Sequence, residues 1–296
     1  MYFEIYLDLG AWFLEFLLFM IYEFYDLVIC DHYFYLKHLS MAYAVCKVPV
    51  APLRAEPAHK SEMISQLLLA EAGLILEEAK DFIKLQSNHD GYEGWCQRSQ
   101  LVVVDTFIKE TTPQTYTAGW VDIIAINNAP AHVPMGIPVL SEANAKELSA
   151  VLKIDYRNAA TWNAAQAKPD AAAIKERAVP FLNTPYLWGG RSVFGIDCSG
   201  FTQMVFRFFN IPLLRDAYLQ ATQGEVVGFL QEARCGDLAF FDNAEGRITH
   251  VGILLNDHEI IHSSGNVRID KIDNAGIVNA ETGVRTHQLR IIKRYF

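Results

Sequence analysis

Cys198 stands where a glycine-rich turn gives way to an apolar run, and a cysteine in that position can act as a nucleophile. Residues 186–204 read Y-L-W-G-G-R-S-V-F-G-I-D-C-S-G-F-T-Q-M, and the apolar pattern that follows predicts a helix beginning at the cysteine. Unpaired backbone amides and the positive end of the helix dipole stabilise a thiolate there. We therefore expect the pKa of Cys198 to lie below the ordinary value of about 8.5. The small Ser199 and Gly200 leave the sulfur open to a substrate.

Two histidines downstream are candidate partners for this thiol. His250 lies in the run R-I-T-H-V-G-I-L-L and His262 in H-E-I-I-H-S-S-G, and both runs predict strands. A cysteine followed by a histidine and a further polar residue is the arrangement of a thiol-dependent hydrolase. We expect His250 to act as the general base and His262 to hold its ring in the useful tautomer. The backbone amide of Cys198 is the expected oxyanion donor.

The other cysteines and histidines lack a comparable context. No C-x-x-C pattern occurs, and the H-E-x-x-H match at His258–His262 lies on a predicted strand rather than on the helix that a zinc site of this kind needs, so neither a metal ion nor another cofactor is expected. We interpret the remaining cysteines as structural and the remaining histidines as surface residues; they are Cys30, Cys46, Cys96 and Cys235, and His32, His38, His59, His89, His132, His258 and His287.

The elements around the candidate residues predict an α+β domain. A helix leads in to Pro180, a second begins at Cys198, and a short helical piece covers residues 216–226. Strands follow at residues 237–241, 249–255, 259–263 and 285–296. A nucleophile on a helix that packs against an antiparallel sheet carrying its base is the papain-like layout. Because helix and sheet share one core, rigid elements set the distance between the thiol and the imidazole.

Short alternating runs in the first half predict strands at residues 45–51, 62–69, 82–87, 94–97 and 101–105. With a turn cluster at residues 88–91, this spacing is typical of a small barrel. Residues 118–126 and 132–140 predict two further strands. Residues 158–175 predict a linker running into a helix that begins near Pro169 and Asp170.

Five motifs occur in one order along the second half: Y-x-W-G-G-R-S, D-C-S-G-F, G-D-L-x-F-F, T-H-V-G-I and I-I-H-S-S-G. From about Ala173 to Phe296 the chain thereby resembles the NlpC-type cysteine peptidases of bacteria. Upstream, A-P-L-R-A-E-P, S-E-M-I-S-Q-L-L and D-G-Y-E-G-W resemble the bacterial SH3-like domain that precedes the peptidase in relatives that recycle cell-wall peptides. The resemblance implies an SH3-like domain over residues 41–160 and a papain-like peptidase domain over residues 161–296. Residues 118–160 are either part of the first domain or a reduced second SH3-like unit.

The resemblance also implies a substrate. Relatives with this pair of domains hydrolyse the γ-D-glutamyl–diamino-acid bond of short peptidoglycan stem peptides and require a free N-terminal L-Ala. Asp197 would supply an anion for the α-ammonium of that alanine, and the same carboxylate can cap the helix of the nucleophile. Tyr92 matches the tyrosine that the SH3-like domain sends into the cleft, while Tyr186 and Ser199 match positions that line it.

Other parts of the substrate site are less defined by the resemblance. Glu56 or Glu62 would supply a second anion. Relatives often carry Ser or Thr in the segment after R-D, where this chain has Ala217 and Tyr218, so one polar contact to the substrate is lost or supplied elsewhere. The sequence predicts neither the choice between meso-diaminopimelate and L-Lys nor the oligomeric state.

Other functions stay open. SH3-like domains often only bind, so the chain could be a non-catalytic cell-wall binding module, although the set of Cys198, His250 and His262 argues against this. An acyltransferase or amidase on a papain-like scaffold is a second class, but there the histidine often precedes the cysteine. A wall-remodelling endopeptidase acting on intact peptidoglycan is the remaining alternative.

Chain length, net charge and cysteine content limit which binding partners and which cellular compartment are expected. At 296 residues the chain is long enough for two domains with their own cores. A net charge of −9 argues against nucleic acid or an anionic membrane surface as a partner. The partner that the resemblance implies is a small peptide substrate. Five cysteines, an odd number without paired spacing, predict free thiols in a reducing compartment, the cytoplasm.

Residues 1–40 are crowded with aromatic and aliphatic side chains but fit neither a signal peptide nor a spanning helix. The first basic residue is Lys37, whereas a signal peptide begins with basic residues. Glu15 and Glu23 interrupt the apolar run that a membrane span needs. Since Met41 reads as a clean start, we expect residues 1–40 to be translated upstream sequence from a misassigned start codon. The alternative is an amphipathic helix at a membrane surface, which would make the protein membrane-associated or periplasmic.

Overall fold

The computed structural model describes residues 42–105 and 114–296 of the chain. Both expectations for residues 1–40, translated upstream sequence and a membrane-surface helix, lie outside the described residues. Ala42–Phe296 form one compact unit. Within the two described ranges, none of the helices has the length and apolar character needed to cross a membrane.

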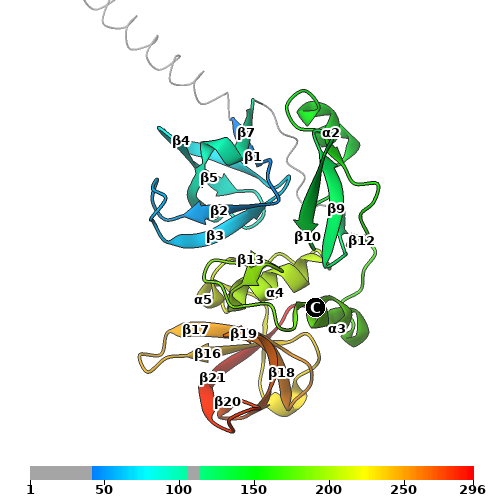
Figure 1. Cartoon of the computed structure of the whole chain (residues 1–296). Coiled ribbons are helices and arrows are strands. Elements are labelled where there is room, and N and C mark those ends of the chain that lie inside the picture. The colour runs from blue at the N-terminus through cyan, green and yellow to red at the C-terminus, as the bar shows by residue number, and fades with distance from the viewer. Residues whose placement is uncertain (1–41, 106–113) are drawn as a thin grey trace, which may run out of the picture. The chain divides into compact units, whose positions relative to one another are not determined.

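The first part of the described chain is a small barrel (Figure 1). Its strands are β1 (Tyr43–Cys46), β2 (Val50–Arg54), β3 (Met63–Leu68), β4 (Ala72–Ala79), β5 (Phe82–Ser87), β6 (Glu93–Gln97) and β7 (Leu101–Val104), with the one-turn helix η1 (Arg98–Gln100) before β7. They form an antiparallel sheet in the order β3-β2-β6-β5-β4-β1-β7. Leu53, Ile83 and Leu85 point into its core. The sequence pattern misses β4, because its run L-E-E-A-K favours a helix, whereas pairing with β1 and β5 holds it extended.

A smaller set of elements follows in sequence. It comprises β8 (Thr115–Thr117), β9 (Val121–Ile126), β10 (Ala129–Pro134), α2 (Glu142–Leu148), β11 (Ile154–Asp155) and β12 (Thr161–Asn163). β9 pairs with β10 and β11, and β8 pairs with β12. The strand expected over residues 132–140 ends at Pro134. Helix α2, which the pattern does not predict, begins after Ser141, whose hydroxyl accepts a hydrogen bond from the amide of Asn144. The reduced second SH3-like unit stays a prediction.

The second half combines helices with a second seven-stranded antiparallel sheet. Its helices are α3 (Ala171–Ala178), η2 (Val179–Phe181), α4 (Cys198–Arg207), α5 (Ala217–Gln220) and η3 (Leu230–Glu232), and β13 (Arg191–Ser192) pairs with β14 (Gly195–Ile196). The sheet holds β15 (Glu225–Val227), β16 (Leu238–Asp242), β17 (Ile248–Leu254), β18 (Glu259–Ser264), β19 (Asn266–Asp273), β20 (Gly276–Val278) and β21 (Arg285–Arg294). Its order is β15-β21-β16-β17-β18-β19-β20, and β20 also pairs with β21.

Most predicted elements of this half are confirmed. The helix at Cys198 and the strands of the sheet that carry His250 and His262 lie where the periodicity places them. The helical piece expected over residues 216–226 is limited to the four residues of α5, because the chain turns at residues 221–224 and β15 begins at Glu225. The pattern misses β19 and β20 altogether.

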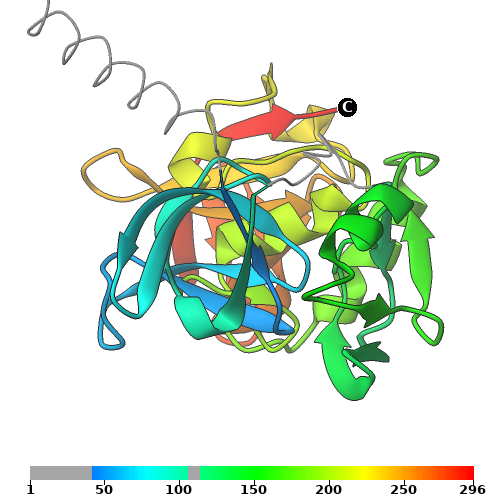
Figure 2. The same cartoon turned by 90° about the horizontal axis from the view of Figure 1, so that it is seen from above.

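Helix α4 lies against β17 and β18 of this sheet (Figures 1 and 2). Phe201 and Val205 on the helix and Val251 and Ile261 on the strands are fully buried in one core. Burying such a side chain contributes about 1.5–3 kcal/mol each. This packing therefore holds the helix, and the cysteine at its first position, at a set distance from the strands.

The start of α4 is shaped by two further contacts. The carboxylate of Asp197 caps the helix by accepting a hydrogen bond from the amide of Gly200 at 2.7 Å. A Cβ atom on Gly200 would lie 2.2 Å from the carbonyl oxygen of Gly190. Only glycine admits this close approach of the helix start to the preceding turn, which explains the small residues after Cys198.

Buried charges join the barrel to the second half. Glu71, just before β4, receives hydrogen bonds from Arg207 at the end of α4 at 2.8 Å and from Arg191 on β13 at 3.1 Å. All three side chains are almost inaccessible to solvent. Burial would raise the pKa of Glu71, but the two guanidinium groups outweigh it and hold that pKa well below its usual range.

We expect Glu71→Gln to lower the free energy of unfolding by roughly 3–5 kcal/mol, because it leaves two buried guanidinium groups without their anion. Urea denaturation measures this. Glu78→Gln, which removes an exposed ion pair between β4 and Arg98 of η1, is the control and should cost at most about 1 kcal/mol. Since the folded pKa of Glu71 is depressed, its contribution is complete above the unfolded pKa of about 4.3 and is lost as pH falls further. Equal losses in the two variants would contradict the prediction.

Candidate active site

The thiol of Cys198 lies at the N-terminus of α4 and is only 7% exposed. The backbone of Val251, the residue that follows His250 on β17, lies close enough to the sulfur to lower the pKa of the thiol, and so does the backbone of Ser199. The structure thus brings the predicted nucleophile to the strand that carries the predicted base.

Burial, assisted by the carboxylate of Asp197, raises the pKa of the Cys198 thiol to about 12, against the opposing effects of the Val251 backbone and Arg215. The expectation of a thiol pKa below its ordinary value is therefore wrong. A helix N-terminus favours a thiolate, but removal from water and an adjacent negative charge outweigh it here.

The two predicted histidines meet through their rings. Nε2 of His250 lies 2.8 Å from Nδ1 of His262, which leaves Nδ1 of His250 as the nitrogen that can exchange a proton with the thiol. His262 is buried on β18. It occupies the position that the sequence predicts for the residue that orients the base.

The pKa of the predicted base, His250, is also shifted in the direction that favours its neutral form. Burial lowers the pKa of His250 well below its ordinary value, and the neighbouring rings of His262 and His287 lower it further. Both shifts favour the uncharged forms, a protonated thiol and a neutral imidazole. The arrangement suits transfer of the thiol proton to His250 during attack, rather than a preformed thiolate–imidazolium pair.

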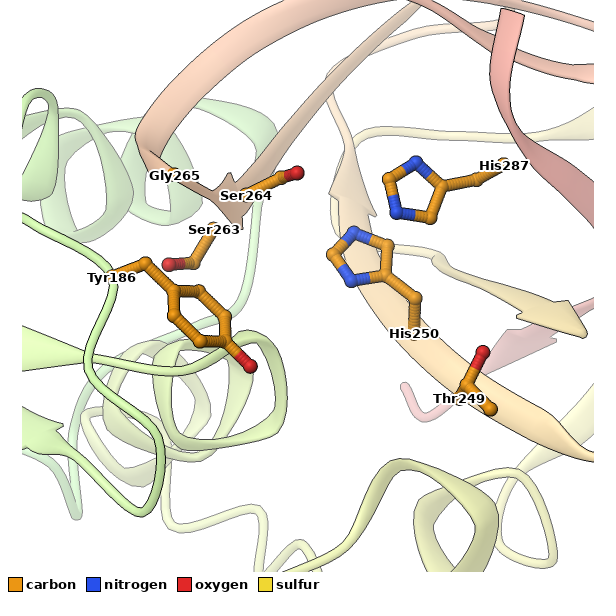
Figure 3. Close-up of a pocket in the computed structure, with 7 residues that line it drawn as sticks. All are labelled: Tyr186, Thr249, His250, Ser263, Ser264, Gly265 and His287. Carbon is orange, nitrogen blue, oxygen red and sulfur yellow. The ribbon is translucent and has the colours of Figure 1, made fainter. Parts of the chain in front are cut away.

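His287, on β21, stacks on the ring of His250, with centroids 4.1 Å apart and planes inclined by 23°. Its interpretation as a surface residue is wrong. With His250 it lines a pocket of about 270 Å³ whose other walls are Tyr186, Thr249, Ser263, Ser264 and Gly265. In Figure 3, Tyr186 and Ser263 lie on one side of this pocket, and His250 and His287 on the other. No local pattern marks His287, because only the return of β21 beside β16 and β20 brings it to the site.

Asp270, on β19, extends the line of hydrogen bonds beyond His262. Its Oδ2 atom lies 3.0 Å from Nε2 of His262, and its side chain is buried. Sequence reasoning missed it because the strand itself was missed. Two aspartates stand in R-I-D-K-I-D, and only the pairing of β19 with β18 decides that Asp270, not Asp273, reaches the histidine.

The carboxylate of Asp197 is engaged on several sides. It accepts hydrogen bonds from the amides of Gly189 at 2.9 Å and Gly200 at 2.7 Å, and Nη1 of Arg215 lies 3.0 Å from its Oδ1 atom. The hydroxyl of Ser199 accepts from the same guanidinium at 2.9 Å. The negative charge predicted to meet the substrate is therefore balanced by a buried arginine that the sequence reasoning did not single out.

The barrel sends two side chains to the second half. The hydroxyl of Tyr92 donates to Asp216 at 3.2 Å, directly before α5. The indole of Trp188 donates to Glu62 at 2.6 Å. The two glutamates considered as a second anion are both exposed in the loop between β2 and β3, and of the two it is Glu62 that contacts the second half of the chain.

The sequence matches two known domain families. Residues 183–286 match the NlpC/P60 family, and residues 53–101 match the bacterial dipeptidyl-peptidase SH3 domain. A gamma-D-glutamyl-L-lysine dipeptidyl-peptidase of Bacillus cereus is 27% identical over 77% of this chain and 76% of its own length. A protein of the same name from Bacillus subtilis is 29% identical over 67% of this chain and 71% of its own length. A probable endopeptidase p60 of Listeria innocua is 38% identical, but over 35% of this chain and 22% of its own length.

Solved structures share the fold. An NlpC/P60 family protein from Bacillus cereus superposes with a TM-score of 0.68 at 22% identity, covering 86% of this chain and 99% of its own. An NlpC/P60 endopeptidase from Photobacterium damselae gives 0.60 at 16% identity, covering 85% of this chain and 66% of its own. The predicted fold, a papain-like α+β peptidase domain behind a small SH3-like barrel, is confirmed.

Alkylation by iodoacetamide tests the neutral state of Cys198, since only the thiolate reacts. The rate is expected to rise steadily from about pH 6 to about pH 9, because the thiol pKa lies above that range. Mass spectrometry of the labelled peptide measures the rate, and Cys198→Ala corrects for reaction of the half-buried Cys235. A rate already constant at about pH 6 would show a preformed thiolate.

Proposed function

We propose that this protein, which carries an NlpC/P60 cysteine-peptidase domain behind a bacterial dipeptidyl-peptidase SH3 domain, hydrolyses the γ-D-glutamyl–diamino-acid bond of short peptidoglycan stem peptides that begin with a free L-Ala. The observation that carries the proposal is the extent of similarity. The dipeptidyl-peptidases match this chain over both domains, whereas the p60 endopeptidase matches about a third of it.

The site supports a two-step acyl transfer. The sulfur of Cys198 attacks the γ-carbonyl of D-Glu as its proton passes to Nδ1 of His250, and the oxyanion is stabilised by the unpaired backbone amide of Cys198. His250 then gives the proton to the α-nitrogen of the diamino acid, which leaves, and a thioester remains. Water, deprotonated by His250, attacks the thioester and releases L-Ala-D-Glu with the thiol restored.

The leaving diamino acid fits the pocket beside His250, since that ring must reach the departing nitrogen. The pocket is lined by hydroxyls and by His287, and a neutral imidazole and hydroxyls can hydrogen-bond a carboxylate or an ammonium alike. Assays should therefore include tripeptides that end in L-Lys and in meso-diaminopimelate.

The α-ammonium of L-Ala is proposed to meet the carboxylates gathered where the barrel contacts the peptidase half. Asp197, whose charge Arg215 already balances, would share this role with Asp216, which is half-buried and hydrogen-bonded by Tyr92. Ser199 and Tyr186 would complete the walls near the nucleophile. Glu62, which receives a hydrogen bond from Trp188, is the better placed second anion of the two exposed glutamates Glu56 and Glu62.

We also propose the cytoplasm as the compartment. Cys46, Cys96, Cys198 and Cys235 are free thiols, which is typical of a reducing environment. A peptidase restricted to short peptides with a free amine acts on imported wall fragments rather than on the intact wall. Fractionation of cells carrying a tagged chromosomal copy tests this, and recovery outside the cytoplasm would contradict it.

Cys198→Ala is expected to abolish release of L-Ala-D-Glu, and Cys198→Ser to lose nearly as much, because a hydroxyl is a far weaker nucleophile at neutral pH. Mass spectrometry of L-Ala-γ-D-Glu-L-Lys incubated with each protein measures the rate. Cys235→Ser, which removes a half-buried thiol outside the site, should retain activity. If either Cys198 variant keeps more than about 1% of the wild-type rate, equivalent to about 2.7 kcal/mol, the nucleophile lies elsewhere.

The free-amine tripeptide is expected to be cleaved at least ~100-fold faster than its N-acetyl form, a difference of about 2.7 kcal/mol. Acetylation removes the charge that the carboxylates would pair with and adds bulk against the barrel. Asp216→Asn should lower kcat/KM for the free-amine peptide far more than for the acetylated one, while the exposed Asp257→Asn should change neither. Asp197→Asn is a poorer test because it also strands the buried Arg215. Equal rates on both peptides would indicate a wall-remodelling endopeptidase instead. Binding of the peptides without cleavage would indicate a cell-wall binding module.

A further inference from the structure

We propose that Asp270 is a positioning residue of this site: its carboxylate sets which nitrogen of His262 carries the proton and, through His262, leaves Nδ1 of His250 free to accept the proton of Cys198. This inference rests on the proposed function only for its kinetic test.

The surroundings of Asp270 hold its carboxylate in place. Its Oδ1 atom accepts a hydrogen bond from the amide of Ala280 at 2.8 Å, and its Oδ2 atom faces Nε2 of His262 at 3.0 Å. The guanidinium of Arg268 lies 2.9 Å from Oδ2, and its other end faces Glu281 at 3.5 Å. The Asp270 side chain is 2% exposed, so water does not compete for these contacts.

The carboxyl group of Asp270 is ionised at neutral pH. Burial would raise its pKa, but hydrogen bonds from His262 and the Ala280 amide outweigh this and lower the pKa to about 2. An ionised carboxylate only accepts hydrogen bonds. Nε2 of His262 must therefore be the protonated nitrogen that donates to it.

The position of the proton on His262 then fixes the position of the proton on His250. When the single proton of the His262 ring is on Nε2, Nδ1 has a lone pair, and it lies 2.8 Å from Nε2 of His250. Nε2 of His250 must donate to that lone pair, so the base carries its own proton on Nε2. Nδ1 of His250 is left as the acceptor, and it is the nitrogen that the mechanism needs.

Without the carboxylate of Asp270, nothing fixes which nitrogen of His262 carries the proton. A His262 protonated on Nδ1 would donate to Nε2 of His250 and place the proton of that ring on Nδ1, where it blocks transfer from the thiol. An asparagine at position 270 offers His262 either a donor or an acceptor, and so removes the preference while keeping size and shape. Orienting partners of this kind typically change activity by roughly 10–100-fold.

The kinetic test compares Asp270→Asn with Asp273→Asn. Asp273 lies on the same strand and pairs with Arg285 at 2.7 Å, but it contacts neither histidine of the line. We expect kcat of Asp270→Asn to fall roughly 10–100-fold with KM nearly unchanged, because neither Asp270 nor His262 lines the substrate pocket. Asp273→Asn should keep both constants. A wild-type kcat in Asp270→Asn, or an equal fall in the control, would overturn the proposal.

Nitrogen NMR of ¹⁵N-histidine-labelled protein tests the tautomers without any substrate, with resonances assigned from His250→Gln and His262→Gln. In the wild type both His250 and His262 should carry their protons on Nε2, and in Asp270→Asn the Nδ1-protonated form of His262 should appear. Protonated Nδ1 on either ring of the wild type would overturn the proposal even if the variant did not fold, and so would unchanged tautomers in a folded Asp270→Asn. A wild type that cleaves none of the peptides but shows these tautomers would overturn the proposed function alone.

Discussion

The packing of α4 against β17 and β18 is the constraint on which the site depends. It brings the first residue of a helix to the strand that carries His250, although the two residues lie far apart in the chain. The helix cannot slide or turn, because Asp197 caps its start and is itself held by Arg215, while Arg207 at its other end is held by Glu71. A nucleophile and a base placed by rigid elements need little reorganisation when a substrate binds.

The same packing decides the protonation state of the site. Enclosure of Cys198 and His250 disfavours charge on either, and so favours a neutral thiol beside a neutral imidazole. A neutral thiol is protected from adventitious oxidation and alkylation. In the proposed mechanism the thiol proton moves only when a substrate binds, and the orientation of the histidine protons matters because Nδ1 of His250 must start unprotonated.

The barrel is joined to the peptidase half through buried charges as well as through apolar contact. Glu71 forms ion pairs with two arginines of the second half. Removing one partner from a buried group of this kind lowers the free energy of unfolding far more than removing one partner from a surface ion pair. This junction lets Tyr92 and Glu62 reach residues near the site. A barrel held in this way can act as a wall of the cleft, which suits a peptidase that rejects long or blocked chains.

The sequence by itself determined that Cys198 begins a helix and that His250 and His262 lie on strands, because a glycine turn, a helix start and two apolar strands are local patterns. It also determined the fold, through motifs in one order. Only the tertiary structure decided the thiol pKa, since burial is set by distant packing, and only it recruited Arg215, Asp270 and His287. Those three side chains reach the site through helix packing, the register of a strand that no pattern marked, and the return of the last strand. Such contacts between residues remote in the chain leave no periodicity in a single sequence.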